Sequence, residues 1–120
     1  KAVIPQEFGH LAINIEKDDL MLANWIGLGN YDYNAFKDLK GGCYYVLAES
    51  GAIAFEKNPH YKSVPELKKL KLRDLPELGI KNGKDFPILD LKNAPQKLDW
   101  LINPEKYKEL LTIENLYKEI

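Results

Sequence analysis

The chain has 120 residues and a mass of 13.8 kDa, a size at which single domains are common. Hydrophobic residues make up 45% and charged residues 29% of it, which indicates a folded globular protein and excludes a disordered one. The formal net charge of −1 gives no overall field that would attract nucleic acid. All apolar runs are far shorter than the roughly 20 residues that span a bilayer, so no membrane segment is expected.

The sequence contains one cysteine, Cys43, and no segment with the composition of a linker. A lone cysteine excludes an internal disulfide and favours a reducing compartment, so we expect a cytoplasmic protein. No repeat, low-complexity tract or Gly/Ser-rich stretch divides the chain. Residues 1–120 are therefore expected to form a single compact domain.

The first third of the chain carries a strand pattern followed by helix patterns. Residues 9–15 place apolar side chains at alternate positions, which predicts a strand with one buried face. Residues 18–28 repeat apolar side chains at spacings of three and four after two aspartates, which predicts a short helix. A second helix is expected in residues 30–40, ended by Gly41 and Gly42.

The central part of the sequence predicts a hairpin and then a capped helix. Residues 43–48 and 52–56 have strand composition, and the intervening Glu-Ser-Gly is typical of a sharp reversal. Ser63 and Glu66 have the spacing of a capping box, which predicts a helix N-terminus. Over residues 43–70 this order resembles the SUKH class of bacterial immunity proteins, and the resemblance implies an inhibitor that binds another protein.

The last part of the sequence predicts a turn-rich connection, an edge strand and a helical end. Pro76 and Gly79 interrupt residues 72–80, whereas residues 86–91 follow an Asn-Gly reversal and contain a proline, as an edge strand can. From residue 95 an apolar stripe at helical spacing is expected to close the core. The sequence therefore predicts an α+β fold, with a mostly antiparallel sheet of about four strands, packing helices and a closing C-terminal helix.

Motifs for phosphate loops, paired-histidine metal helices, nucleophile elbows and metal-spaced Cys/His clusters are absent, so neither a metal nor another cofactor is expected. Isolated residues leave an alternative, a small hydrolase. His10 and His60 could act as the acid and base of an RNase, since strand cleavage needs two proton-transfer groups. Cys43 with His10 could form the thiolate and imidazole pair of a thiol hydrolase.

The first hypothesis is a non-catalytic protein-binding domain, with an inhibitor or immunity-type protein as one form of it, that acts through an aromatic and acidic surface. Tyrosine combines a large apolar area with a polar tip and therefore serves well as an interface anchor. The candidate binding residues are Tyr31, Asp32, Tyr33, Phe36, Tyr44 and Tyr45. We expect another protein as partner and not nucleic acid, because lysines and carboxylates alternate in residues 66–77. The oligomeric state is left open.

Overall fold

A computed structural model describes residues 1–49 and 51–120. The chain forms two compact units, each built from segments that are distant in sequence. The core unit contains Lys1–Phe8, Leu22–Gly29 and Lys68–Ile120, and the hairpin unit contains Gly9–Met21 and Asn30–Leu67. The expectation of one domain over residues 1–120 stays a prediction.

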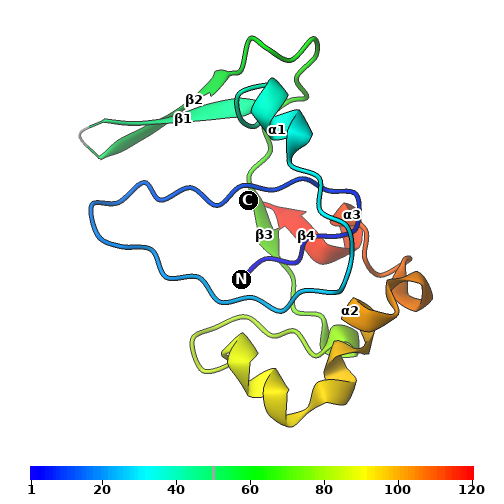
Figure 1. Ribbon diagram of the computed structural model, residues 1–120. Helices are drawn as coiled ribbons and strands as arrows, with labels where there is room; N and C mark the ends of the chain where they lie inside the picture. Colours follow the sequence, from blue (N-terminus) through cyan, green and yellow to red (C-terminus); the bar gives the residue numbers. More distant parts are fainter. Residues whose placement is uncertain (50) are drawn as a thin grey trace. The chain divides into compact units, whose positions relative to one another are not determined.

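The secondary structure is mixed, as the α+β prediction requires, and its elements are short (Figure 1). With η for a 3-10 helix, the order is α1 (Asn34–Asp38), β1 (Tyr44–Glu49), β2 (Ala52–Lys57), β3 (Leu70–Leu72), η1 (Pro76–Leu78), η2 (Ile88–Asn93), η3 (Pro95–Leu98), α2 (Asp99–Ile102), η4 (Pro104–Tyr107), α3 (Ile113–Leu116) and β4 (Tyr117–Glu119). In the described residues these strands form two antiparallel pairs, β1–β2 and β3–β4. One sheet of about four strands was therefore a wrong prediction. None of the helices in these residues is long and apolar enough to cross a membrane.

The hairpin of the hairpin unit lies where the sequence predicted it. Its register runs from Tyr44 opposite Lys57 to Glu49 opposite Ala52. The reversal uses Gly51 at a φ of 85°, in the left-handed region that glycine adopts at little cost. Residue 50, which the reversal prediction also included, lies outside the described residues.

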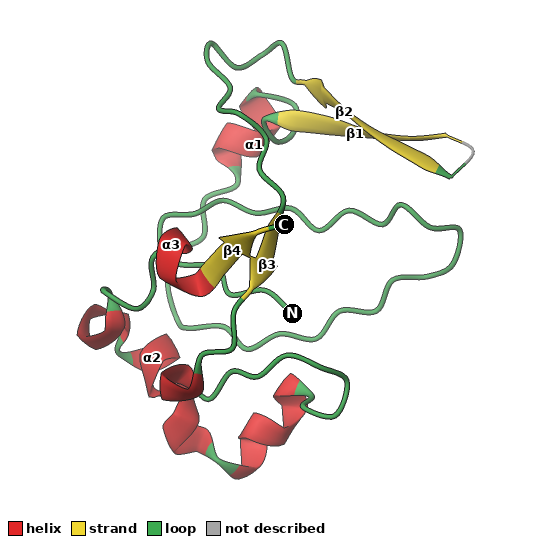
Figure 2. Cartoon of the chain, turned by 180° about the vertical axis from the view of Figure 1, so that it is seen from behind, coloured by secondary structure: helices red, strands yellow, loops and turns green. Residues whose placement is uncertain are grey.

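The strand expected in residues 9–15 and the helix expected in residues 18–28 are not formed, and both segments are drawn as loop in Figure 2. A strand needs a partner for its hydrogen bonds, and alternation alone does not supply one. A short helix needs an apolar surface on which to pack. Met21, in the predicted stripe, is 94% exposed, so that surface is missing. The expected second helix exists, shortened to α1.

The capping box at Ser63 and Glu66 does not start a helix, and the chain continues without regular structure until β3. Within the hairpin unit the Tyr44 hydroxyl donates to the Pro65 carbonyl at 2.7 Å. This bond takes a carbonyl that a helix would pair with a backbone N–H four residues later. The resemblance to the immunity proteins depended on this helix, so its structural basis is lost.

Residues 72–80 form the expected turn-rich connection, with η1 and a bridge between Leu75 and Ile80. Residues 86–91 were wrongly predicted as an edge strand. Pro87, with a φ of −65°, instead begins the 3-10 turns of η2. After residue 95 the helical run is broken into η3, α2, η4 and α3, because Pro95 and Pro104 lack the N–H that a continuous helix needs. The chain ends in β4, so a closing C-terminal helix was also a wrong prediction.

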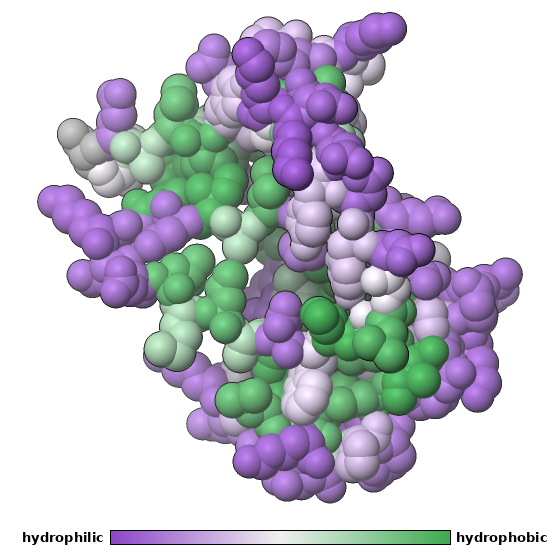
Figure 3. Space-filling model, in the orientation of Figure 1, coloured by the Kyte–Doolittle hydropathy of each residue, from purple (hydrophilic) through white to green (hydrophobic). Residues whose placement is uncertain are grey.

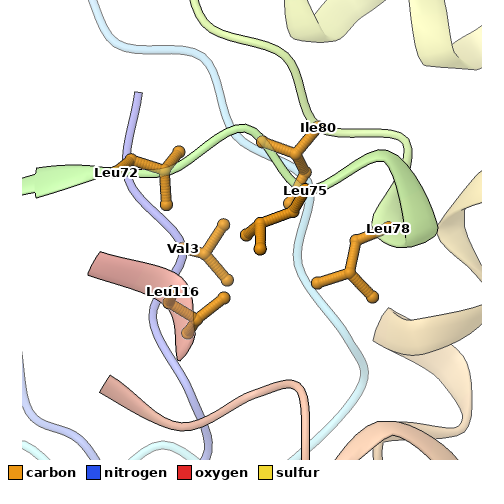
Figure 4. Close-up of a cluster of buried hydrophobic side chains, with 6 residues drawn as sticks. All are labelled: Val3, Leu72, Leu75, Leu78, Ile80 and Leu116. Atoms are coloured by element: carbon orange, nitrogen blue, oxygen red, sulfur yellow. The ribbon is translucent and has the colours of Figure 1, made fainter. Parts of the chain in front are cut away.

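Buried apolar side chains form a cluster in the core unit (Figure 4), and its most deeply buried members are Leu78 and Leu116, which are 1% and 0% exposed. The cluster contains Val3, Leu72, Leu75, Leu78, Ile80 and Leu116. The Tyr117 hydroxyl accepts from the Val3 N–H at 2.9 Å and donates to the Val3 carbonyl at 2.8 Å. The first residues of the chain are thereby fixed to β4.

A polar cluster joins α2 to η4 in the same unit. The Asp99 carboxylate accepts from the Asn103 amide at 2.6 Å and from the Tyr107 hydroxyl at 2.9 Å. These two bonds, with Lys106 at 3.9 Å, hold the pKa of Asp99 below its ordinary value. The same carboxylate raises the pKa of Tyr107. The cluster stabilises the turn between the two helices.

Candidate functional site

Asn58, directly after β2, is a buried polar side chain in the hairpin unit, with an exposed fraction of 1%. Its amide group donates to the carbonyls of Leu39 at 2.8 Å and Gly42 at 2.9 Å. Its amide oxygen accepts from the Tyr45 hydroxyl at 3.1 Å and from the His60 N–H at 3.0 Å. Both donors of the amide and both lone pairs of its oxygen are therefore used, as burial of a polar group demands.

These bonds fasten the turn after α1 to the turn after β2. Lys40 and Gly41 in the first turn have φ values of 55° and 121°. The Tyr61 hydroxyl, from the second turn, donates to the Gly41 carbonyl at 2.9 Å. The backbone N–H of Asn58 donates to the Cys43 carbonyl at 2.9 Å. We call residues 39–43 and 58–61 together the Asn58 loop pair.

Cys43 and His60 both belong to the Asn58 loop pair, and the backbone of each is hydrogen-bonded to Asn58. The Cys43 thiol is free and half-buried, whereas the His60 imidazole is exposed. Burial, and secondly the charge of Cys43, raise the pKa of the Tyr61 phenol. A thiol, a phenol and an imidazole thus belong to one pair of loops.

His10 lies in the extended segment of the hairpin unit with its side chain exposed. The residues on either side of His10 are held by contacts within the hairpin unit. A methyl group on Gly9 would lie 2.8 Å from the Cζ atom of Phe36 in α1, and one on Gly42 would lie 3.1 Å from the Cδ1 atom of Leu11. The two residues that flank His10 therefore lie against α1 and the Asn58 loop pair.

The predicted aromatic surface separates into two groups. Tyr31 and Tyr33 are 56% and 62% exposed, and Asp32 between them accepts from the Asn34 N–H at 2.8 Å, at the start of α1. The other members, Phe36, Tyr44 and Tyr45, are half-buried. The hydroxyls of Tyr44 and Tyr45 donate to Pro65 and Asn58, so these two tyrosines stabilise the hairpin unit itself.

Sequence reasoning missed Asn58. An asparagine before a proline is a turn signal, which would have located the turn but not the burial of the side chain. Residues 1–49 and 51–120 contain no group of three or more His, Cys, Asp or Glu side chains that could hold a metal ion.

The chain is thus an α+β protein in which the candidate residues Cys43 and His60 lie on the turns before β1 and after β2. It belongs to the glucose-6-phosphate isomerase (GPI) family, whose model matches residues 1–64. The matched residues contain α1, the hairpin and the whole Asn58 loop pair. No match was found among curated proteins or among solved structures.

Proposed function

We propose that this chain takes part in the isomerisation of glucose 6-phosphate. The observation that carries the proposal is the family match over residues 1–64, because those residues hold nearly all of the hairpin unit. The residues that the Asn58 loop pair holds together are in the same segment.

Conversion of an aldose to a ketose moves a hydrogen from C2 to C1 and another from the C2 oxygen to the C1 oxygen. Atoms and electrons balance within the substrate, so no other reactant is consumed. The reaction needs groups that take and return protons near neutral pH, and histidine is the side chain whose ordinary pKa suits this task. Both histidines of the chain, His10 and His60, lie in the matched segment. We assign them as the candidate proton-transfer groups.

Asn58 would act on this site as a positioning residue. Its amide oxygen accepts from the His60 N–H and its amide group holds the turn that contains Gly42, the residue against which Leu11 lies. The turn that carries His60 and the turn against which Leu11 lies therefore both depend on the buried side-chain amide of Asn58.

We expect His10→Ala or His60→Ala to lower kcat for glucose 6-phosphate isomerisation by about 100-fold or more, because a proton-transfer group contributes roughly 10²–10⁴. The ketose product formed by the purified chain is measured. A variant that keeps full activity removes that histidine from the assignment. Absence of turnover by the unmodified chain, or full activity in both variants, would contradict the proposal.

The hydrolase alternatives use the same side chains, His10 with His60 or with Cys43, in another reaction. Offering RNA or a thiol-sensitive ester in place of glucose 6-phosphate separates these hypotheses. Product formation from RNA that is lost in His60→Ala would favour the RNase.

A second candidate function, binding of another protein without catalysis, is supported by the exposure of Tyr31 and Tyr33. Asp32 and Asp38 lie on the same segment and are exposed, so a partner with a basic surface is favoured. The narrower idea of an immunity-type inhibitor loses support without the helix at Ser63. What is retained is a protein-binding surface at residues 31–38.

Tyr33→Ala is expected to weaken a complex with such a basic protein by about tenfold or more, the loss of an aromatic anchor. The melting temperature should not change, because the side chain is mostly exposed. Binding is measured by pull-down at two salt concentrations, with Lys37→Ala in the adjoining helix α1 as control. An equal loss in both variants, or an unchanged complex, would remove the surface at residues 31–38 from consideration.

A further inference from the structure

A cavity of about 190 Å³ lies in the core unit, and its described lining contains none of the residues that the isomerase proposal uses. Ile80, Phe86 and Leu91 give it apolar walls. Three lysines line it as well: Lys1, Lys81 and Lys97. Figure 3 shows that hydrophobic and strongly hydrophilic side chains lie next to one another on the face of the molecule in view.

Two of the three lysines are held by neighbouring groups. The Lys81 ammonium lies 4.1 Å from the centroid of the Phe86 ring, within the range of a cation–π contact. The Lys1 ammonium donates to the carbonyls of Lys81 and Gly83. An ammonium has three donors, so both groups keep hydrogen-bonding capacity for a ligand.

The third lysine, Lys97, lies against Gly79, which also lines the cavity. Gly79 ends η1 with a φ of 66°, and a methyl group there would lie 3.0 Å from Cδ and 3.1 Å from Cβ of Lys97. The apolar stem of Lys97 therefore lies along the Gly79 backbone. A larger residue at position 79 would be strained by its φ and would also push this stem away.

Positive charge prevails in the lining. Asp90 is the one carboxylate among the described lining residues, against the three lysines. Asp74 lies near Lys1 and Lys81, but its carboxylate already accepts two bonds from Asn82, at 2.7 and 3.2 Å. In residues 1–49 and 51–120 the ion pair found is Lys106 with Asp99, so none of the three lysines is neutralised by a carboxylate in contact.

We propose that this cavity binds a phosphate group, either inorganic phosphate or the monoester of a small metabolite. Lysines act as point charges toward phosphate and do not require the planar geometry that arginine imposes. The apolar walls suit a short carbon chain next to the phosphate. The volume lies below the roughly 300–1,000 Å³ of pockets for drug-sized ligands, so a nucleotide is too large. Of the described lining residues only Lys1 falls in the family match, so this proposal stands apart from the isomerase proposal.

The test is titration of the whole chain with inorganic phosphate at constant ionic strength, followed by amide chemical shifts. Saturable shifts are expected at Gly79, Ile80 and Lys81. Lys81→Met and Lys97→Met should each weaken phosphate binding by about tenfold, as loss of one charge-assisted hydrogen bond predicts. Lys92→Met, on η2 but outside the cavity lining, is the matched control and should bind normally.

Titrations with glucose 6-phosphate and with glucose show whether the cavity prefers a phosphate monoester or inorganic phosphate. Glucose 6-phosphate that shifts the same amides at lower concentration than inorganic phosphate indicates a monoester site, and equal affinity indicates recognition of the phosphate group alone. Shifts caused by glucose, shifts that do not saturate, or an equal loss in Lys92→Met would each overturn the proposal. Because binding is the readout, an inactive chain would refute the isomerase proposal without affecting this one.

Discussion

Asn58→Ala is expected to lower the free energy of unfolding by about 3 kcal/mol, measured by urea unfolding. The substitution leaves the carbonyls of Leu39 and Gly42 without their donor, and the Tyr45 hydroxyl and His60 N–H without their acceptor. Each buried group without a partner costs about 1–3 kcal/mol, but water that enters the space can bind some of the four groups and recovers part of this free energy.

Two single-bond variants calibrate this effect. Tyr45→Phe removes one bond to Asn58, and Tyr61→Phe removes the bond to the Gly41 carbonyl. Each substitution should lower the free energy of unfolding by about 1 kcal/mol, the usual net contribution of one hydrogen bond. If Asn58→Ala costs no more than Tyr45→Phe, the buried amide does not organise the loop pair, and its positioning role in the proposed isomerase fails with it.

Leu116→Ala is expected to lower the free energy of unfolding by about 3 kcal/mol, because the side chain is fully buried among the residues of a small core. The cavity left beside the other five side chains of the cluster has few neighbours able to fill it. Ile120→Ala is the matched control, since Ile120 is apolar, close in sequence and 76% exposed. It should change stability by less than about 0.5 kcal/mol, and a similar loss in both variants would contradict the core assignment.

The two substitutions also test the expectation of a single domain. Asn58 belongs to the hairpin unit and Leu116 to the core unit. In a single cooperative domain either substitution lowers the protection of amides in both units against hydrogen exchange. If each lowers protection only in its own unit, residues 1–120 contain two domains.

Local sequence signals predicted the elements that need only neighbouring residues. The hairpin was located to within one residue at each end, because strand composition and a glycine reversal act over about a dozen adjacent positions. The connection at residues 72–80 was also correct, because Pro76 and Gly79 restrict their own backbone whatever surrounds them. The loop position predicted for His60 also agrees with the structure, whereas the roles of Cys43 and His60 stay predictions.

The sequence by itself therefore determined the α+β class, the hairpin and the positions of chain reversal. The tertiary structure alone decided whether residues 9–15 would pair as a strand and whether residues 18–28 would pack as a helix, because both depend on partners elsewhere in the chain. It also decided the importance of Asn58. The residues next to Asn58 in the sequence do not show that its side-chain amide is buried, since one of the groups that it binds, the Leu39 carbonyl, is distant in sequence. Burial makes those bonds costly to lose, and burial is a property of the fold.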